Sequence, residues 1–135
     1  MGNTGRWAGG LLGAAAVAAG LSGVAQPANA ASSTSFGSSD GTVWGTITWG
    51  AKTATVSGYE YGTSAGTSYY TEGQYFIGNG RYICNITPTR SNYADGITKH
   101  ATDYVDCGSR YLFTVMVVFK QGSAQQVKYY DNPLT

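Results

Sequence analysis

The sequence predicts an all-β fold, a small antiparallel β-sandwich of about seven strands with one disulfide. The chain has 135 residues, which is enough for one domain. Glycine occurs 20 times and 13% of residues are aromatic, as expected for short strands joined by tight turns. After residue 41, no segment keeps helical spacing over three turns. Strands joined by turn signals, without helices, favour a sandwich.

The first thirty residues have the pattern of a secretory signal peptide. Arg6 precedes an apolar run over residues 11–21, and Ala28-Asn29-Ala30 places small residues at the positions before a cleavage site. We expect cleavage near Ala30, Sec export, and a product with no remaining membrane attachment. The Ala/Gly-rich apolar core is similar to leaders from high-GC Gram-positive bacteria, the group that includes the actinobacteria.

Residues 31–41 are rich in Ser and Gly, and we expect a flexible arm ahead of a domain over residues 42–135. Phe36 is the only large apolar side chain in this arm. Two interpretations stay open. The arm is either a spacer left by export, or a segment that becomes ordered on a partner with Phe36 as its anchor.

The expected strands alternate apolar and polar residues and are separated by Gly, Asn, Ser or Pro. The clearest turn is Gly78-Asn79-Gly80, a strong hairpin signal. The run 111–119 is apolar on both faces, which places it in the middle of a sheet or under a partner. The seven expected strands cover residues 43–49, 54–61, 69–77, 81–87, 97–107, 111–120 and 125–130.

The chain has two cysteines, Cys84 and Cys107, and an exported protein with two thiols is expected to pair them. The bridge is predicted to tie the fourth strand to the fifth, or to the turn after it. In the chain-entropy model a loop of this length stabilises the fold by about 3 kcal/mol.

Composition excludes several classes of function. A net charge of +1 gives no basic surface for nucleic acid. One His and two Cys cannot supply the four ligands of a structural zinc site, and no other feature indicates a metal or a cofactor.

No set of residues makes a convincing catalytic site, so we expect a non-enzymatic protein. The run Gly62–Gly66 matches G-x-S-x-G, but a strand rather than a helix is expected to follow it. His100 is expected to share a face with Asp106, while Asp103 takes the other. Glu60 and Glu72 are the only glutamates, on strands expected to be neighbours, and a chance pair of acids is a weak indication of a glycosidase.

The aromatic residues are the strongest functional signal. Trp44 and Trp49 are expected on opposite faces of the first strand, so that one fills the core and the other lies outside, beside Tyr59 and Tyr61. An exposed aromatic surface set among Ser and Thr suits a protein contact or sugar stacking. Cross-strand aromatic pairs that serve stability alone are the simpler alternative.

The run Thr46-Ile47-Thr48-Trp49-Gly50-Ala51-Lys52-Thr53-Ala54-Thr55-Val56-Ser57-Gly58 and the tail Tyr130-Asp131-Asn132-Pro133 resemble parts of small secreted actinomycete β-sandwich proteins. These include the adaptor subunits of umbrella toxin particles. The resemblance implies a non-catalytic adaptor that links a lectin subunit to a large toxin polypeptide. It transfers no functional residue position by position.

The leading hypothesis is therefore a secreted protein-binding module, an adaptor in an extracellular complex, with Phe36, Trp44, Tyr59 and Tyr61 contacting another secreted protein. A carbohydrate-binding module for cell-wall or extracellular polysaccharide is the alternative. A further alternative is a protease or glycosidase inhibitor that presents loop 62–68 or loop 88–96.

Overall fold

We analysed a computed structural model of the chain, which describes residues 32–86 and 91–135. The predicted signal peptide and part of loop 88–96 lie outside these residues. The described residues form eight β-strands and no helix. The strands are β1 (Ser32–Gly37), β2 (Val43–Trp49), β3 (Thr53–Tyr61), β4 (Thr67–Ile77), β5 (Gly80–Ile86), β6 (Thr98–Asp106), β7 (Thr114–Gln121) and β8 (Ala124–Asp131).

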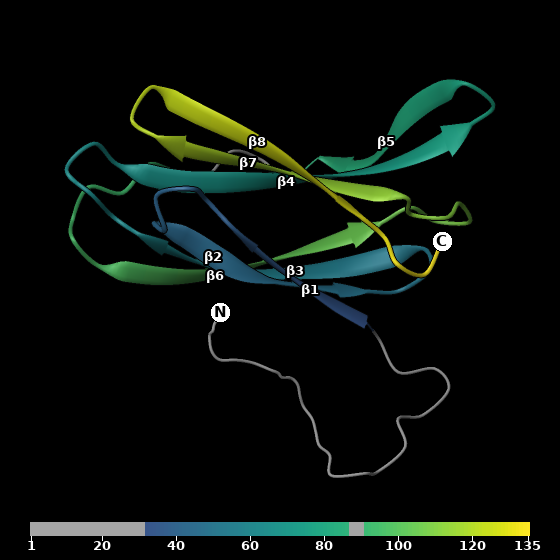
Figure 1. The fold of residues 1–135 in the computed structure, drawn as a ribbon, viewed down its shortest axis with the longest axis horizontal. Helices are drawn as coiled ribbons and strands as arrows, with labels where there is room; N and C mark the ends of the chain where they lie inside the picture. The colour runs from purple at the N-terminus through teal and green to yellow at the C-terminus, as the bar shows by residue number, and fades with distance from the viewer. Residues whose placement is uncertain (1–31, 87–90) are drawn as a thin grey trace, which may run out of the picture. The chain divides into compact units, whose positions relative to one another are not determined.

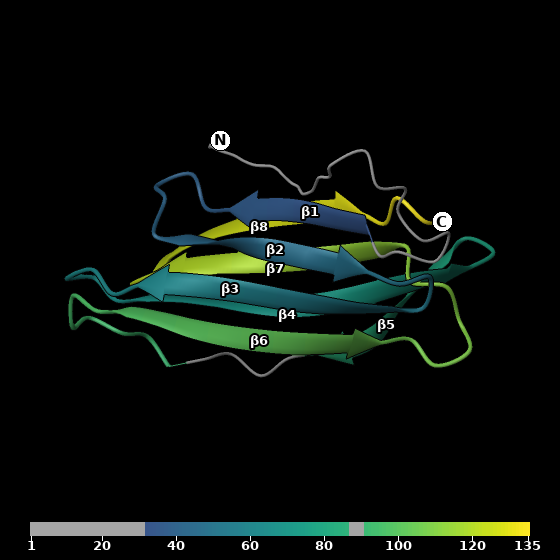
Figure 2. The same cartoon turned by 90° about the horizontal axis from the view of Figure 1, so that it is seen from below.

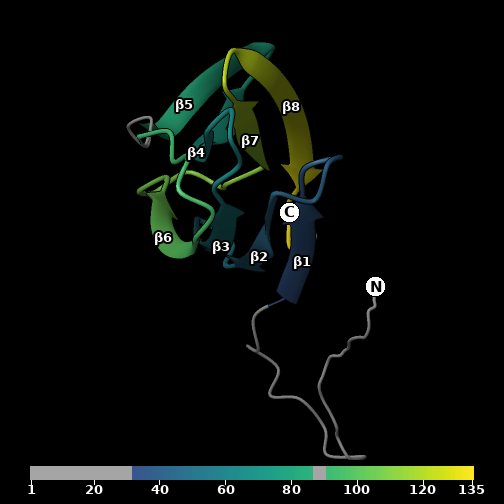
Figure 3. The same ribbon diagram turned by 90° about the vertical axis from the view of Figure 1, so that its left-hand side faces the viewer.

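The strands form two antiparallel sheets of four, so the predicted all-β sandwich is confirmed. One sheet has the order β1-β2-β3-β6 and the other the order β5-β4-β7-β8. Figure 1 shows the two sheets as layers, and Figure 2 looks onto the sheet β1-β2-β3-β6 with the other sheet behind it. Seen from the end, β8 lies over β1 on one side and β5 lies over β6 on the other (Figure 3). The apolar core fills the space between the layers.

The prediction of a flexible arm over residues 31–41 is wrong. Residues 32–37 form β1, which pairs along β2 from Ser32↔Trp49 to Gly37↔Trp44. The physical reason is Phe36, whose side chain is only 5% exposed. It packs over two facing glycines, since a Cβ on Gly45 or Gly58 would lie 2.7 or 3.0 Å from its ring carbon Cζ. The compact unit therefore spans residues 31–135 rather than 42–135.

Phe36 is the centre of what we call the inner aromatic cluster, formed by Phe36, Tyr69, Phe119 and Tyr130. The ring centroid of Phe36 lies 5.9 Å from that of Tyr69 and 6.3 Å from those of Phe119 and Tyr130. These rings come from both sheets, so the cluster joins the two layers. Partial burial raises the pKa of the Tyr130 phenol.

Each side of the sandwich is closed in a different way. On one side, the predicted disulfide joins Cys84 in β5 to Cys107 just after β6. The side-chain amide of Asn85 also donates to the Tyr104 carbonyl at 2.9 Å. On the other side, Lys128 Nζ donates to the Gly37 carbonyl at 2.7 Å and Gln126 Nε2 donates to Ser39 Oγ at 2.5 Å.

The seven predicted strands correspond to β2 through β8, with one instructive difference in the sixth. Residues 111–113 lie outside β7, which begins at Thr114. Their backbone N–H groups form hydrogen bonds outside the β7 ladders: Leu112 N donates to the Ala51 carbonyl and Phe113 N to the Gln74 carbonyl. The rest of this apolar run forms β7, an inner strand of its sheet, as its two apolar faces predict.

Candidate functional site

Three rings stand in line across the outside of the first sheet. The strand register pairs Trp44 in β2 with Tyr59 in β3, and Tyr59 with His100 in β6. The centroids are 5.7 Å apart for Trp44 and Tyr59, with planes at 17°, and 4.7 Å apart for Tyr59 and His100, with planes at 28°. We call these three residues the outer ring row.

The rings of this row cover one another's faces. Their planes are nearly parallel, and the distances between their centroids are close to the spacing of neighbouring strands in a sheet. Tyr59, the middle ring, has a neighbouring ring on each side and is 41% exposed. At the β1 end, the position paired with Trp44 is Gly37, so no side chain of that residue covers the last ring. The row is therefore a continuous stack of three rings, with Trp44 at the β1 end.

Beside the ring row lie two rows of hydroxyl side chains on the same face. Ser57 joins the first of them to the rings, because its Oγ lies 2.8 Å from Nε2 of His100. The two rows are Ser35–Thr46–Ser57–Thr102 and Ser33–Thr48–Thr55–Tyr104. Tyr61, which pairs with Thr98, lies on the other side of the ring row. We call the ring row, Tyr61 and the hydroxyl rows together the outer face.

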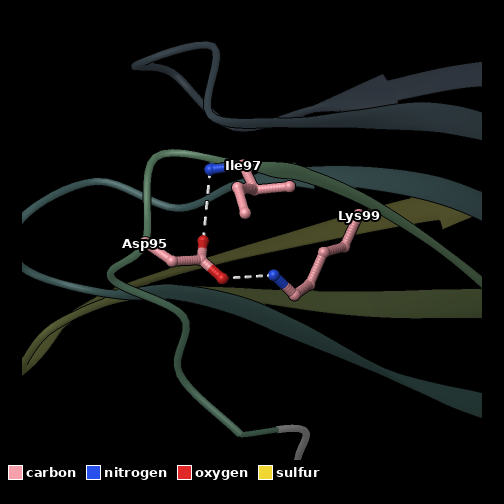
Figure 4. A network of polar contacts seen from close by, with 3 residues as sticks. All are labelled: Asp95, Ile97 and Lys99. Atoms are coloured by element: carbon pink, nitrogen blue, oxygen red, sulfur yellow. Dashed lines mark hydrogen bonds and ion pairs between the residues drawn. The ribbon is translucent and has the colours of Figure 1, made fainter.

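The strands place almost no charge on the outer face. Asp106 shares it, at the far end of β6 from His100, and its carboxylate accepts from the Gly108 N–H at 2.8 Å. Lys99, next to His100, is less exposed than its outward-facing neighbours and forms an ion pair with Asp95 (Figure 4). That contact is the main reason for the lowered pKa of Asp95, which also accepts from Ile97 N at 3.1 Å. The loop into β6 is thus fixed just before His100.

The residues considered for catalysis do not come together. Asp103 is buried, on the face opposite His100, and accepts from Thr71 Oγ1 at 3.1 Å. Glu60 lies in β3 and Glu72 in β4, so the expectation that they occupy neighbouring strands is wrong: these strands belong to different sheets. Residues 62–66 connect two strands, without the helix that a nucleophile elbow requires.

The predicted partner-binding residues divide into two groups. Trp44, Tyr59 and Tyr61 are 41%, 41% and 43% exposed and gather on the outer face, whereas Trp49 is the tryptophan that fills the core. Phe36 is buried, so it is not available as an exposed anchor. The correction follows from the glycines beneath it, which leave room for its ring.

Sequence reasoning missed two features. His100 belongs to the outer ring row, but the period-two pattern of residues 97–107 could not reveal that β6 pairs with β3 in this register. It also missed a group of exposed apolar residues at the β4–β5 turn, which includes Phe76, Tyr82 and Ile83. The alternation of these residues is visible in the sequence. The point at which β4 loses its neighbour β7 is not.

Comparison with known protein families, with curated proteins and with solved structures finds no match for this chain. In residues 32–86 and 91–135, no three His, Cys, Asp or Glu side chains come together in a way that could hold a metal ion. A search of the same residues for an apolar helix of membrane-spanning length finds none.

Proposed function

We propose that this protein is a secreted, non-enzymatic protein-binding module whose outer face contacts its partner. The observation that carries the proposal is the gathering of Trp44, Tyr59 and Tyr61, each about two-fifths exposed, on a nearly uncharged surface. Centres of protein interfaces are enriched in Trp and Tyr and depleted in charge.

The stacking of the ring row supports a protein contact further. Rings that already hold one another lose little conformational freedom on binding, which lowers the cost of association. The three side chains also carry polar groups, an indole N–H, a phenol O–H and imidazole nitrogens, and Ser and Thr hydroxyls lie in the next rows. The complementary partner surface is uncharged and offers backbone amides or side-chain hydroxyls.

The disulfide agrees with an oxidising compartment, and the predicted signal peptide supports export. The resemblance to umbrella-toxin adaptors supports a place in an extracellular complex of an actinobacterium. On that proposal, the partner is a large toxin polypeptide or a lectin subunit.

A carbohydrate-binding module is the second candidate, and one observation favours it. Gly37 leaves the outer side of the Trp44 ring without a paired side chain, and Ser35 and Thr46 supply hydroxyls in the next row. A ring face beside hydroxyl groups can hold one sugar ring. Against a longer glycan, the other rings are stacked on each other rather than spread as a platform.

The test is affinity capture of tagged protein from the producer's culture supernatant, with Trp44→Ser/Tyr59→Ser as the outer-face variant. Tyr129→Ser is the matched control, because Tyr129 is an exposed aromatic residue on β8 of the other sheet. We expect a stoichiometric partner with wild type and control, and its loss with the outer-face variant. Equal recovery from all three contradicts the proposal. If the tagged protein is recovered without a partner, and its retention on polysaccharide depends on Trp44, the second candidate is selected.

A further inference from the structure

We propose that the end of the β4–β5 hairpin inserts into an apolar cleft with an acidic rim on a partner protein. We call residues 75–83 the hairpin arm. The inference rests on the proposed function, since it adds a second contact to the same binding module. The arm and the outer ring row belong to different sheets, so each can be removed without touching the other.

The hairpin arm is a two-stranded ribbon that its own sheet does not continue. β4 pairs with β7 from Thr67 to Gln74, and beyond Gln74 it pairs with β5 alone. Figure 1 shows this end of β4 and β5 curving away from the other strands. A two-stranded ribbon is marginally stable in water unless something packs against it.

The arm carries large apolar side chains on both of its sides. Tyr75 and Tyr82 are paired and stacked on one side, with centroids 5.5 Å apart. Phe76 points to the other side, where its ring meets the edge of Phe113 at 5.5 Å. Phe76 and Ile83 lie on one side of the ribbon and Ile77 and Tyr82 on the other, and all four remain between 42% and 48% exposed. Such an exposed group indicates an interaction site.

The arrangement specifies the shape and charge of the occupant. A flat partner surface could cover only one side of the ribbon, so a concave cleft is required to bury both. Arg81 is the only charged residue from Gln74 to Ile83, and it is exposed on the same side as Phe76. An acidic group at the rim of the cleft complements it.

Two other occupants fit less well. The leading point of the arm is the turn Gly78-Asn79-Gly80, which has no apolar side chain and would carry bare backbone polar groups into a membrane. A second copy would have to supply the cleft. One groove among the described residues, between Asp40 and Phe119, holds about 240 Å³, which is too small to receive the arm.

The experiment places a photoreactive p-benzoylphenylalanine at Phe76 or at Tyr82, on opposite sides of the arm, in the full chain expressed in its producer. We expect both positions to cross-link to one and the same protein, at sites next to Asp or Glu. With the photoreactive residue at position 82, the double substitution Phe76→Ser/Ile83→Ser should lower the cross-linking yield at least about tenfold. Arg81→Glu should lower the same yield about fivefold. The control Tyr129→Ser should leave it unchanged.

Cross-linking from one side only, to a second copy of this chain, or to nothing overturns the proposal. So does sedimentation with phosphatidylglycerol/phosphatidylethanolamine vesicles that depends on Phe76. The two proposals fail separately. If the outer-face variant captures its partner at the wild-type level and the arm still cross-links, the role of the outer face is contradicted and the role of the arm is not. Capture that depends on the outer face, with no arm cross-link, contradicts only the role of the arm.

Discussion

The inner aromatic cluster and the outer ring row lie on opposite sides of the hairpin formed by β2 and β3. The spacing between their rings is similar, but their exposure and the origin of the rings that they contact differ. On the hairpin's inner side, Phe36 meets rings from the opposite sheet and is 5% exposed. On its outer side, Trp44 and Tyr59 stack on rings of their own sheet and are each 41% exposed. The inner aromatic cluster joins two layers and stabilises the fold, whereas the outer ring row joins neighbouring strands of one sheet and remains exposed at Trp44 and Tyr59.

The largest effect is expected from Phe36→Ala. Removing a buried ring that contacts three others should lower the free energy of unfolding by about 3–5 kcal/mol. Chemical denaturation of the variant and the wild type measures this loss. A loss below about 1 kcal/mol would mean that β1 is attached loosely and that the distinction between the two groups is wrong.

Gly45→Ala tests the same cluster from the opposite strand. The new Cβ would lie 2.2 Å from the Ser57 carbonyl oxygen and 2.7 Å from Phe36 Cζ, so backbone and ring must both move. We expect a loss of about 1–3 kcal/mol, measured by the same denaturation. Thr46→Ala, at the next residue and on the outer face, is the control and should change stability far less. Equal effects of the two substitutions would contradict the account.

Trp44→Ser combined with Tyr59→Ser should separate binding from folding. The two substitutions remove two stacked cross-strand pairs, Trp44–Tyr59 and Tyr59–His100, each worth about 1 kcal/mol or less, so the melting transition should remain cooperative with the disulfide formed. A variant that unfolds like Phe36→Ala would show that the ring row serves stability alone.

The smallest effect concerns pH and the turn between β1 and β2. Hydrogen bonds from the Thr42 N–H, at 3.0 Å, and from Ser38 Oγ, at 2.7 Å, lower the pKa of Asp40 below its ordinary value of about 3.9. Because the folded pKa is the lower one, this stabilisation is present above about pH 4 and disappears as the pH falls through the folded value. The stability of Asp40→Asn should therefore fall less steeply in acid than that of wild type. Parallel curves would contradict it.

The sequence was sufficient to predict the sandwich, the cysteine pair and the positions of seven strands, because period-two alternation and turn residues are local signals. It also placed Trp44 and Trp49 on opposite faces. It could not assign β1, since Ser-Ser-Thr-Ser has little apolar content and Phe36 is buried only because two glycines from other strands face it. It could not show that His100 completes the ring row or that the hairpin arm lacks a neighbour, because both depend on long-range register.

The most direct test measures unfolding and partner capture on the same three proteins: wild type, Phe36→Ala and Trp44→Ser/Tyr59→Ser. The account predicts that Phe36→Ala loses about 3–5 kcal/mol of stability, while its still-folded fraction captures the partner. It predicts that the outer-face variant, which loses two stacked pairs, stays within about 2 kcal/mol of wild type but no longer captures the partner. Capture by the outer-face variant at the wild-type level would contradict the assignment of the outer face as the binding surface.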